Sequence, residues 1–174
     1  MNDVLKAIKE RRSIRSYKED PVPQEILDQI IEAGLYAASG MGRQSAIVVE
    51  ITGKELRDRL SAANAEIMGH TGTDPFYGAP TVLIVLADKK CPTYLHDGSL
   101  VMGNMMLAAH ALGLGSCWIH RAKEEFETEE YKKLLADLGV TGDYEGIGHC
   151  VVGYADCEAP DAAPRKEGRV FMAE

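Results

Sequence analysis

The longest helix expected from the sequence, residues 94–112, is apolar on nearly every side, and this restricts how the chain can fold. Its middle reads Val101-Met102-Gly103-Asn104-Met105-Met106-Leu107-Ala108-Ala109, and Gly113 is placed to end it. Such a helix lies either at the centre of a core or against another subunit. In a chain of 174 residues one core rarely surrounds a whole helix. The sequence therefore favours contact with a second subunit.

The other apolar segments predict one domain of mixed α and β structure over residues 1–174, without repeats or a domain boundary. The run Thr81–Ala87 lacks polar alternation, which is typical of an interior strand covered on both faces. Further strands are expected at 47–51, 114–119 and 147–154, and helices at 3–11, 23–35, 53–68 and 123–138. The tail from Ala155 on is rich in Pro, Ala and charge, so it needs a surface to lie on or is disordered.

Helical periodicity also predicts which faces of two of these helices point inward. The expected inward sets are Leu56, Leu60, Ala63 and Ile67 in the helix at 53–68, and Phe126, Tyr131, Leu134, Leu135 and Leu138 in the helix at 123–138. Asp97, near the start of the long helix, is interpreted as a helix-start residue, because its negative charge interacts favourably with the positive end of the helix dipole.

The charge balance and the cysteines narrow the class of protein. Lys and Arg number 19 against 27 Asp and Glu, which gives a net charge of −8 and argues against nucleic acid or an anionic membrane as a partner. No apolar run approaches membrane-spanning length and no signal pattern opens the chain, so we expect a cytoplasmic protein. Cys117 and Cys150 lie in strand-like runs and are predicted to be buried free thiols. Cys117 and His120 lack a second pair at zinc-site spacing, so no metal site is expected.

The segment Arg11-Arg12-Ser13-Ile14-Arg15-Ser16-Tyr17 concentrates three guanidiniums within five residues. Because each guanidinium is permanently charged and carries five donors, the cluster suits a phosphate group. An alternative is that these arginines interact only with the C-terminal end of the first helix. Residues 37–44, Ala-Ala-Ser-Gly-Met-Gly-Arg-Gln, form a glycine-containing loop that could approach a flat or anionic ligand, or could simply connect a helix to a strand.

Several common catalytic motifs are missing from the sequence. Gly113-Leu114-Gly115 lacks the third glycine of a dinucleotide fingerprint, and there is neither a phosphate-binding Gly-Lys-Ser/Thr loop nor a Gly-x-Ser-x-Gly elbow. The histidines are scattered without ligand spacing. An anion clamp and a glycine loop without a protein nucleophile predict a site in which a bound cofactor carries the chemistry and the protein binds and orients it.

These features occur together in a known family. The segment at 11–17, Ala38-Ser39-Gly40-Met41-Gly42-Arg43-Gln44, Tyr77-Gly78-Ala79-Pro80, Asn104 in its apolar helix, Gly113-Leu114-Gly115-Ser116-Cys117-Trp118-Ile119, Val152-Gly153-Tyr154 and Pro164-Arg165-Lys166 follow one another in the order seen in the nitroreductase family. The chain resembles the short, single-domain branch of these FMN-dependent NAD(P)H oxidoreductases. The resemblance implies an α+β fold with a central mixed or antiparallel sheet flanked by helices, and an intertwined homodimer with flavin sites at its interface.

The resemblance also implies which residues bind FMN. Positions that match the family's cofactor contacts are Arg11, Arg12, Ser13, Arg15, Ser39, Gly40, Met41, Gln44, Asn104, Cys117, Trp118, Ile119, His120, Arg165 and Lys166. The arginines at 11–15 would lie near the phosphate and the pyrimidine edge, and Arg165 would be a second phosphate ligand. The loop at 39–44 would approach the flavin, often from the other subunit. No side chain is expected to be catalytic, since flavin N5 carries the reaction.

One part of the sequence departs from the family pattern. Gly42 stands where the family loop usually has Asn, and Ser45-Ala46 replace Pro-Trp. The missing amide removes a possible hydrogen bond to the flavin edge, worth about 0.5–1.5 kcal/mol net. Gly69–Phe76 is expected to border the site.

The expected reaction is ping-pong hydride transfer from NADH or NADPH through FMN to a nitroaromatic, a quinone or a similar flat electrophile. A different flavin reaction (dehydrogenation, dehalogenation or flavin fragmentation) and a non-catalytic flavin-binding or sensing module are alternatives.

Overall fold

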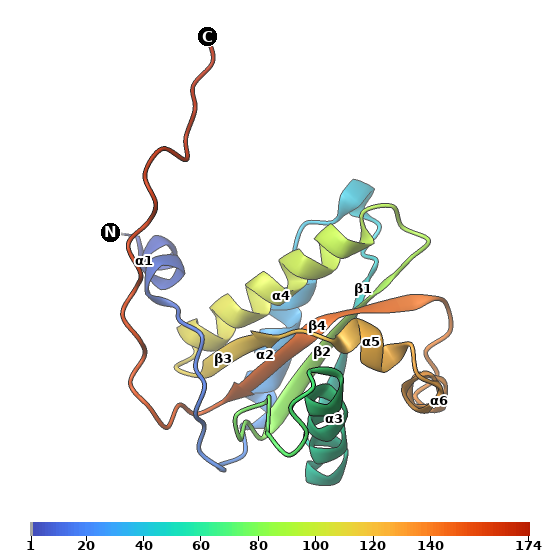
Figure 1. The fold of residues 1–174 in the computed structure, drawn as a ribbon. Coiled ribbons are helices and arrows are strands. Elements are labelled where there is room, and N and C mark those ends of the chain that lie inside the picture. Colours follow the sequence, from blue (N-terminus) through green and yellow to red (C-terminus); the bar gives the residue numbers. More distant parts are fainter. Residues whose placement is uncertain (1) are drawn as a thin grey trace.

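The computed structural model describes residues 2–174, so the first residue of the predicted domain lies outside the described part. Four antiparallel strands form one sheet in the order β1-β2-β4-β3 (Figure 1). The strands are β1 (Ala46–Ile51), β2 (Thr81–Asp88), β3 (Gly115–Ile119) and β4 (Tyr144–Gly153). The helices are α1 (Asp3–Glu10), α2 (Gln24–Leu35), α3 (Lys54–Ile67), α4 (Tyr94–Ala111), α5 (Ala122–Phe126) and α6 (Glu129–Asp137), with a short 3-10 turn, η1 (Gly40–Gly42). The α+β class and the helix-flanked sheet are confirmed.

Helices cover both faces of the sheet, which explains the unbroken apolar run in β2. Val82, Ile84 and Leu86 pack into the layer of α3, α5 and α6, whereas Leu83 and Val85 pack into the layer of α2 and α4. Successive side chains of a strand point to opposite faces, so each layer takes alternate residues. All five are fully buried, as expected for an interior strand.

The long helix α4 packs on one side against its own sheet and α2, and leaves apolar side chains exposed. Met102 and Met105 are fully buried, whereas Leu95 and Leu100 are about half exposed. Helix α1 buries none of its residues, and its Val4, Leu5 and Ile8 stay more than half exposed. Val4 and Ala7 line an apolar groove with Leu107, Ala108 and Ala111 of α4. Within one chain, the face that the sequence assigned to a second subunit is therefore uncovered.

The prediction of a single helix at 123–138 is wrong, because the chain forms two helices there, α5 and α6. The backbone at Thr128 is extended, and its hydroxyl donates to the Glu125 carbonyl at 2.7 Å, which ends α5 and begins α6. Leu138 then stays exposed rather than pointing inward. Helix α3 also differs from its predicted inward face. Ile67 is 40% exposed, while the buried set is Arg57, Leu60, Ser61, Asn64 and Ala65.

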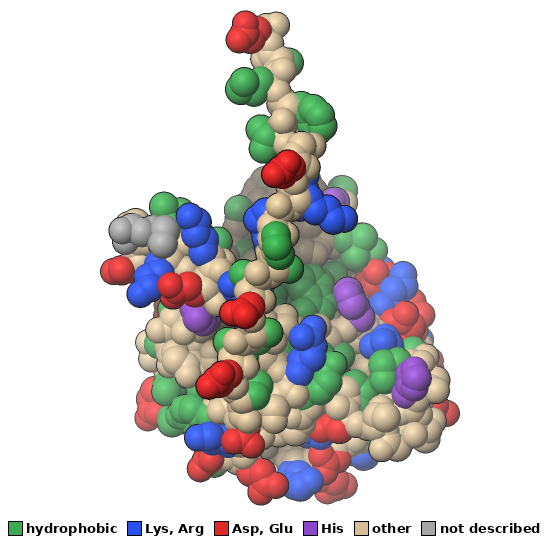
Figure 2. Space-filling view, turned by 60° about the vertical axis from the view of Figure 1, so that its left-hand side comes forward, with side chains coloured by type: hydrophobic (Ala, Val, Ile, Leu, Met, Phe, Trp, Pro, Cys, Tyr) green, Lys and Arg blue, Asp and Glu red, His purple; other side chains and the backbone are tan. Residues whose placement is uncertain are grey.

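The tail beyond β4 projects away from the body (Figures 1 and 2). Ala155 forms an isolated bridge with Tyr17, and from Cys157 to the end every residue is exposed. Val170, Phe171 and Met172, near its end, are between 85% and 91% exposed. The tail therefore finds no surface to lie on within one chain. Across residues 2–174, no helix has the length and apolar character needed to cross a membrane.

Candidate functional site

The arginine segment lies along the outer edge of β3. After α1 ends, Ser13 forms a bridge with Ser116, and the Ile14 N–H donates to the Ser116 carbonyl at 3.0 Å. The Ile14 side chain occupies the space next to Gly115, where a Cβ would overlap it. Two elements far apart in the sequence are thereby fixed together, so the segment at 11–13 and the strand at 115–119 form one surface.

Two guanidinium nitrogens in this segment are buried without a partner. Arg12 Nη1 donates to the carbonyls of Lys9 at 2.6 Å and Arg11 at 2.8 Å, so this arginine does interact with the end of α1. Arg12 Nε and Arg11 Nη1, however, have no hydrogen-bond partner within residues 2–174. Buried donors nearly always find acceptors, so an anionic ligand that brings acceptors fits this place. Arg15 is exposed.

The end of β3 presents aromatic side chains and open backbone groups. In an antiparallel strand alternate residues direct their backbone groups to the same side. Since the Ser116 carbonyl faces outward to Ile14, the backbone groups of Trp118 also face the open edge. The Trp118 ring lies against β4 at Gly148, where a Cβ would overlap the indole nitrogen, and its centroid is 5.8 Å from that of His120. The indole Nε1 is buried and has no partner among the described residues.

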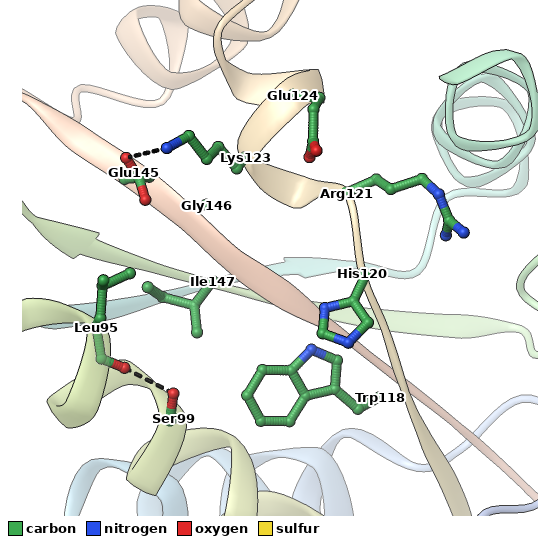
Figure 3. A pocket seen from close by; sticks show the side chains of 10 residues that line it. All are labelled: Leu95, Ser99, Trp118, His120, Arg121, Lys123, Glu124, Glu145, Gly146 and Ile147. Carbon is green, nitrogen blue, oxygen red and sulfur yellow. Dashed lines mark hydrogen bonds and ion pairs between the residues drawn. The ribbon is translucent and has the colours of Figure 1, made fainter. Parts of the chain in front are cut away.

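Two clefts meet at this strand end. One, of about 380 Å³, lies between Leu95 and Ser99 of α4 and the chain at 145–147, and Trp118 and His120 line it (Figure 3). The other, of about 460 Å³, is lined by Trp118 and His120 and by His70, Thr73, Asp74, Pro75 and Tyr77. The space-filling view shows a hollow with a hydrophobic floor beside the tail (Figure 2). The loop at 69–76 therefore borders the candidate site.

The loop at 39–44 is held by a network centred on Asp97. The Asp97 carboxylate accepts hydrogen bonds from the Gly40 N–H at 3.0 Å, from Ser45 Oγ at 2.7 Å and from Thr93 Oγ1 at 3.1 Å. Burial raises the pKa of this carboxyl, but the hydrogen bonds lower it by more, so the pKa lies below its usual range. A Cβ at Gly40 would overlap Thr93, so glycine is needed there. Asp97, read from sequence as a helix-start residue, is the buried acceptor that fixes this loop.

The tip of the loop is exposed at Met41 and Gln44, whereas Ser39 and Gly40 are half-buried. Ser39 Oγ accepts from the Gln44 N–H at 3.0 Å, which closes the turn. Met41 and Gln44 both adopt positive φ, at 55° and 49°, a conformation that is uncommon outside glycine. The Met41 side chain is 90% exposed. A sharply turned loop with an exposed apolar tip is suited to contact something outside its own chain.

Helix α4 separates the two groups of predicted cofactor residues. We call Arg11, Arg12, Ser13, Cys117, Trp118, Ile119 and His120 the edge group, and Ser39, Gly40, Met41 and Gln44 the loop group. Leu95 and Ser99 face the edge group's cleft, whereas Asp97 and Val101 line a cavity with the loop group. Two residues along a helix correspond to about 200° around its axis. The two groups therefore lie on opposite sides of α4 and do not meet within one chain.

Of the remaining predicted residues, Arg15 is exposed and belongs to neither group, and three others lie elsewhere. Asn104 donates from Nδ2 to the Ala33 carbonyl at 3.1 Å and lines the apolar groove between α1, α2 and α4. Arg165 hydrogen bonds to the Ala163 carbonyl within the exposed tail, and Lys166 is exposed beside it. The structure of one chain does not bring these three residues to the edge group.

Sequence reasoning missed a set of buried polar residues behind the site. Glu125 and His149 are fully buried and 2.6 Å apart, and Asn64 bonds to both Glu125 and the His120 carbonyl. Arg57 donates to Asp74 at 2.6 Å in the loop that borders the cleft. Helical periodicity showed only the apolar faces of these elements, and a single buried polar residue leaves no periodic signal. Within residues 2–174, no group of three or more His, Cys, Asp or Glu side chains is arranged to hold a metal ion.

Comparison with known proteins assigns the chain to a family. The family model for the nitroreductase family matches residues 8–154, which include the arginine segment, the loop group and the whole sheet. The chain therefore belongs to the nitroreductase family.

Individual relatives agree with this assignment. An FMN reductase (NAD(P)H) of Bacillus subtilis is 34% identical over 138 residues, which cover 67% of this chain and 53% of that protein. An NADPH-flavin oxidoreductase of Vibrio harveyi is 28% identical over 191 residues, covering 100% of this chain and 74% of that protein. The crystal structure of a nitroreductase with bound FMN from Bacteroides fragilis is 32% identical, with a TM-score of 0.87 and 100% coverage of both chains.

Proposed function

We propose that this protein is an FMN-dependent oxidoreductase that takes a hydride from NADH or NADPH and reduces a flat electrophile such as a quinone or a nitroaromatic. The observation that carries the proposal is the pair of buried guanidinium nitrogens without acceptors, beside an open strand edge and two clefts. Family membership and FMN-linked relatives support the same cofactor.

The edge group fits FMN in its chemistry. Arg11 and Arg12 offer unpaired charge-assisted donors, which suit a phosphate or the polar edge of a flavin. Trp118 and His120 offer flat rings, and Trp118 also offers outward backbone groups, beside the cleft walls. The loop group would complete the site from a second subunit, and Arg165 and Lys166 of the tail would add cations near the phosphate.

The protein's own part in the reaction is to bind, orient and stabilise charge. When bound, FMN accepts a hydride from the nicotinamide and then passes two electrons to the second substrate. The guanidiniums of the edge group and the outward N–H groups of β3 would stabilise the negative charge that develops on the flavin when it is reduced, as preorganised donors do. Overall, NAD(P)H, a proton and a quinone give NAD(P)⁺ and a hydroquinone. Donor and acceptor would use the same cleft in turn, which is the ping-pong order.

The functional unit in this proposal is a homodimer. The loop group and the edge group lie on opposite sides of α4, and the exposed apolar residues of α1 and α4 offer an interface. A partner related by two-fold symmetry would bring its loop group to this chain's edge group and receive this chain's loop in return. The buried free thiols Cys91, Cys117 and Cys150 favour the reducing cytoplasm as its location.

The proposal is tested by FMN binding followed by turnover. The purified protein is titrated with FMN, and the loaded enzyme is assayed with NADH and NADPH against quinones and nitroaromatics. We expect one FMN per subunit and parallel initial-rate lines when both substrates are varied. A protein that takes up no FMN would contradict the proposal. Bound FMN that neither nicotinamide reduces would instead indicate a flavin-binding module without this activity.

A further inference from the structure

Behind the end of β3 lies a network of three fully buried polar side chains. Asn64 of α3, Glu125 of α5 and His149 of β4 are each 0% exposed. Glu125 Oε2 and His149 Nε2 are 2.6 Å apart, and Asn64 Nδ2 donates to Glu125 Oε1 at 2.8 Å. The Phe76 ring packs against His149, tilted by 45°, with the ring centroids 5.2 Å apart.

The network is attached to consecutive backbone carbonyls of one short segment. Asn64 Nδ2 also donates to the His120 carbonyl at 2.8 Å, and His149 Nδ1 lies 3.4 Å from the Ile119 carbonyl. Arg121 Nη1 donates to Asn64 Oδ1 at 3.3 Å, and its side chain extends away from Trp118 (Figure 3). Three elements thus converge on residues 119–121, the strand end where the two clefts meet.

The backbone of this segment is strained at Arg121 and needs support from the residues around it. Arg121 has φ of 79°, in the left-handed region that is costly for a non-glycine residue. The following residue, Ala122, packs so closely on β4 that a Cβ at Gly146 would overlap its backbone. A strained conformation persists only where its surroundings fix it. A buried polar pair contributes little net stability compared with well-packed apolar side chains, so stability alone does not account for this network.

We propose that Glu125 and His149, with Asn64, are positioning residues that fix the backbone of residues 119–121 so that the outward N–H group of Trp118, at the end of β3, is preorganised toward the flavin. The inference rests on the proposed function for its ligand, but the fixing of the segment is a property of the protein alone. None of the three side chains is catalytic, because each is sealed behind the strand.

The test compares three variants of the network with a control variant in the opposite layer of the fold. Glu125→Gln replaces one of the two carboxylate oxygens, which contact Asn64 and His149, by an NH2 group that cannot accept a hydrogen bond. His149→Gln removes the imidazole ring. Asn64→Ser releases the His120 carbonyl while it leaves the Glu125–His149 pair in place. Leu27→Ala, a fully buried α2 residue in the opposite layer, controls for a general loss of stability through a cavity.

The first readout is hydrogen exchange of the protein without added flavin. We expect the amides of residues 118–121 to exchange at least about tenfold faster in all three variants, through local opening. In Leu27→Ala these amides should change only as much as the core strands do. Unchanged exchange at 118–121 in folded variants would overturn the inference, whether or not the protein binds FMN.

The second readout is the midpoint potential of the FMN-loaded protein. Loosened N–H donors lose more affinity for the electron-rich reduced flavin than for oxidised flavin. A tenfold difference between these losses corresponds to about 30 mV for a two-electron couple, and we expect a fall of this size in Glu125→Gln and His149→Gln but not in Leu27→Ala. If the wild-type protein binds FMN and the variants have the same midpoint potential as the wild type, the inference is overturned and the proposed function is left intact. Wild-type protein that binds no FMN would remove the proposed function, and hydrogen exchange would then decide the positioning of the segment alone.

Discussion

Arg12 makes one of the two interactions that the sequence predicts as alternatives and keeps a donor free for the other. One of its nitrogens bonds to the last carbonyls of α1, while another is buried without an acceptor beside the similarly unpaired Arg11 Nη1. A helix-end interaction and a ligand site are therefore compatible in one side chain. Sequence alone could not separate them, because both interpretations use the same guanidinium.

Replacement of Arg12 by alanine should weaken FMN binding. A hydrogen bond to a charged group contributes about 1.5–3 kcal/mol, so we expect the Kd measured by fluorescence titration to rise about 10- to 100-fold. Arg59→Ala, which removes an exposed arginine from α3, is the matched control and should bind FMN like the parent. Equal affinities in parent and Arg12→Ala would remove this arginine from the cofactor site.

The four thiols should differ sharply in reactivity. Burial raises the pKa of the Cys150 thiol to about 12, so its thiolate is scarce at neutral pH. Cys157 is exposed on the tail. We expect a thiol reagent at pH 8 to modify Cys157 first and to leave Cys150 unmodified in the native state, as mapped by peptide mass spectrometry. Rapid native labelling of Cys150 would contradict its buried position.

At the scale of elements, the loop group depends on α4 through Asp97. Asp97→Asn keeps the size of the side chain but weakens acceptance from Ser45 and the Gly40 N–H. We expect a loss of about 1–3 kcal/mol in unfolding free energy and faster proteolysis within residues 39–46. Ser99→Ala, an exposed position on the same helix, should change neither. An unchanged cleavage rate in the loop would show that Asp97 does not hold it.

The loop that borders the cleft should give the protein a pH-dependent stability. Burial raises the pKa of Asp74, but hydrogen bonds from Arg57, Ser61 and the Gly78 N–H lower it by more, so its folded pKa lies below the unfolded value of about 3.9. The stabilisation is then present above about pH 4 and is lost as pH falls through the folded pKa. Asp74→Asn should be less stable than the parent in urea at pH 7, and the difference should shrink at pH 3. Asp20→Asn, an exposed position, should show no such pattern, and a pH-independent difference in Asp74→Asn would contradict the assignment.

Periodic apolar patterns identified most elements, since burial of a helix face or a strand repeats along the sequence. The strand at 81–88 and the helix at 94–111 follow closely from residues such as Val82 and Met102. The break at Thr128 rests on one local hydrogen bond to the Glu125 carbonyl, which leaves no periodic signal. The roles of Asp97, Glu125 and His149 depend on hydrogen bonds between distant segments, which periodicity cannot show. The resemblance named the edge group and the loop group together, but only the fold shows that α4 separates them.

For the whole molecule, the proposed FMN site requires a second subunit. Gly103 lies in the middle of α4, is exposed, and a Cβ there would meet no atom within 4 Å, so Gly103→Arg should leave the fold of one chain intact. The charge would disrupt an apolar interface, and we expect a monomer of about 19 kDa by light scattering, with FMN affinity at least about tenfold weaker. Gly53→Arg, an exposed glycine without near neighbours at the start of α3, is the control. A monomeric variant with full FMN affinity would show that one chain forms the site.

The proposed function requires that the protein binds FMN and that NAD(P)H reduces the bound flavin. Anaerobic titration of the FMN-loaded protein with NADH and then NADPH, followed by the visible absorbance of the flavin, tests it most directly. We predict complete bleaching by one equivalent of the preferred nicotinamide per bound FMN, and full recovery when a quinone is added. A flavin spectrum that stays unchanged with both nicotinamides, while dithionite bleaches it, would contradict the proposed function.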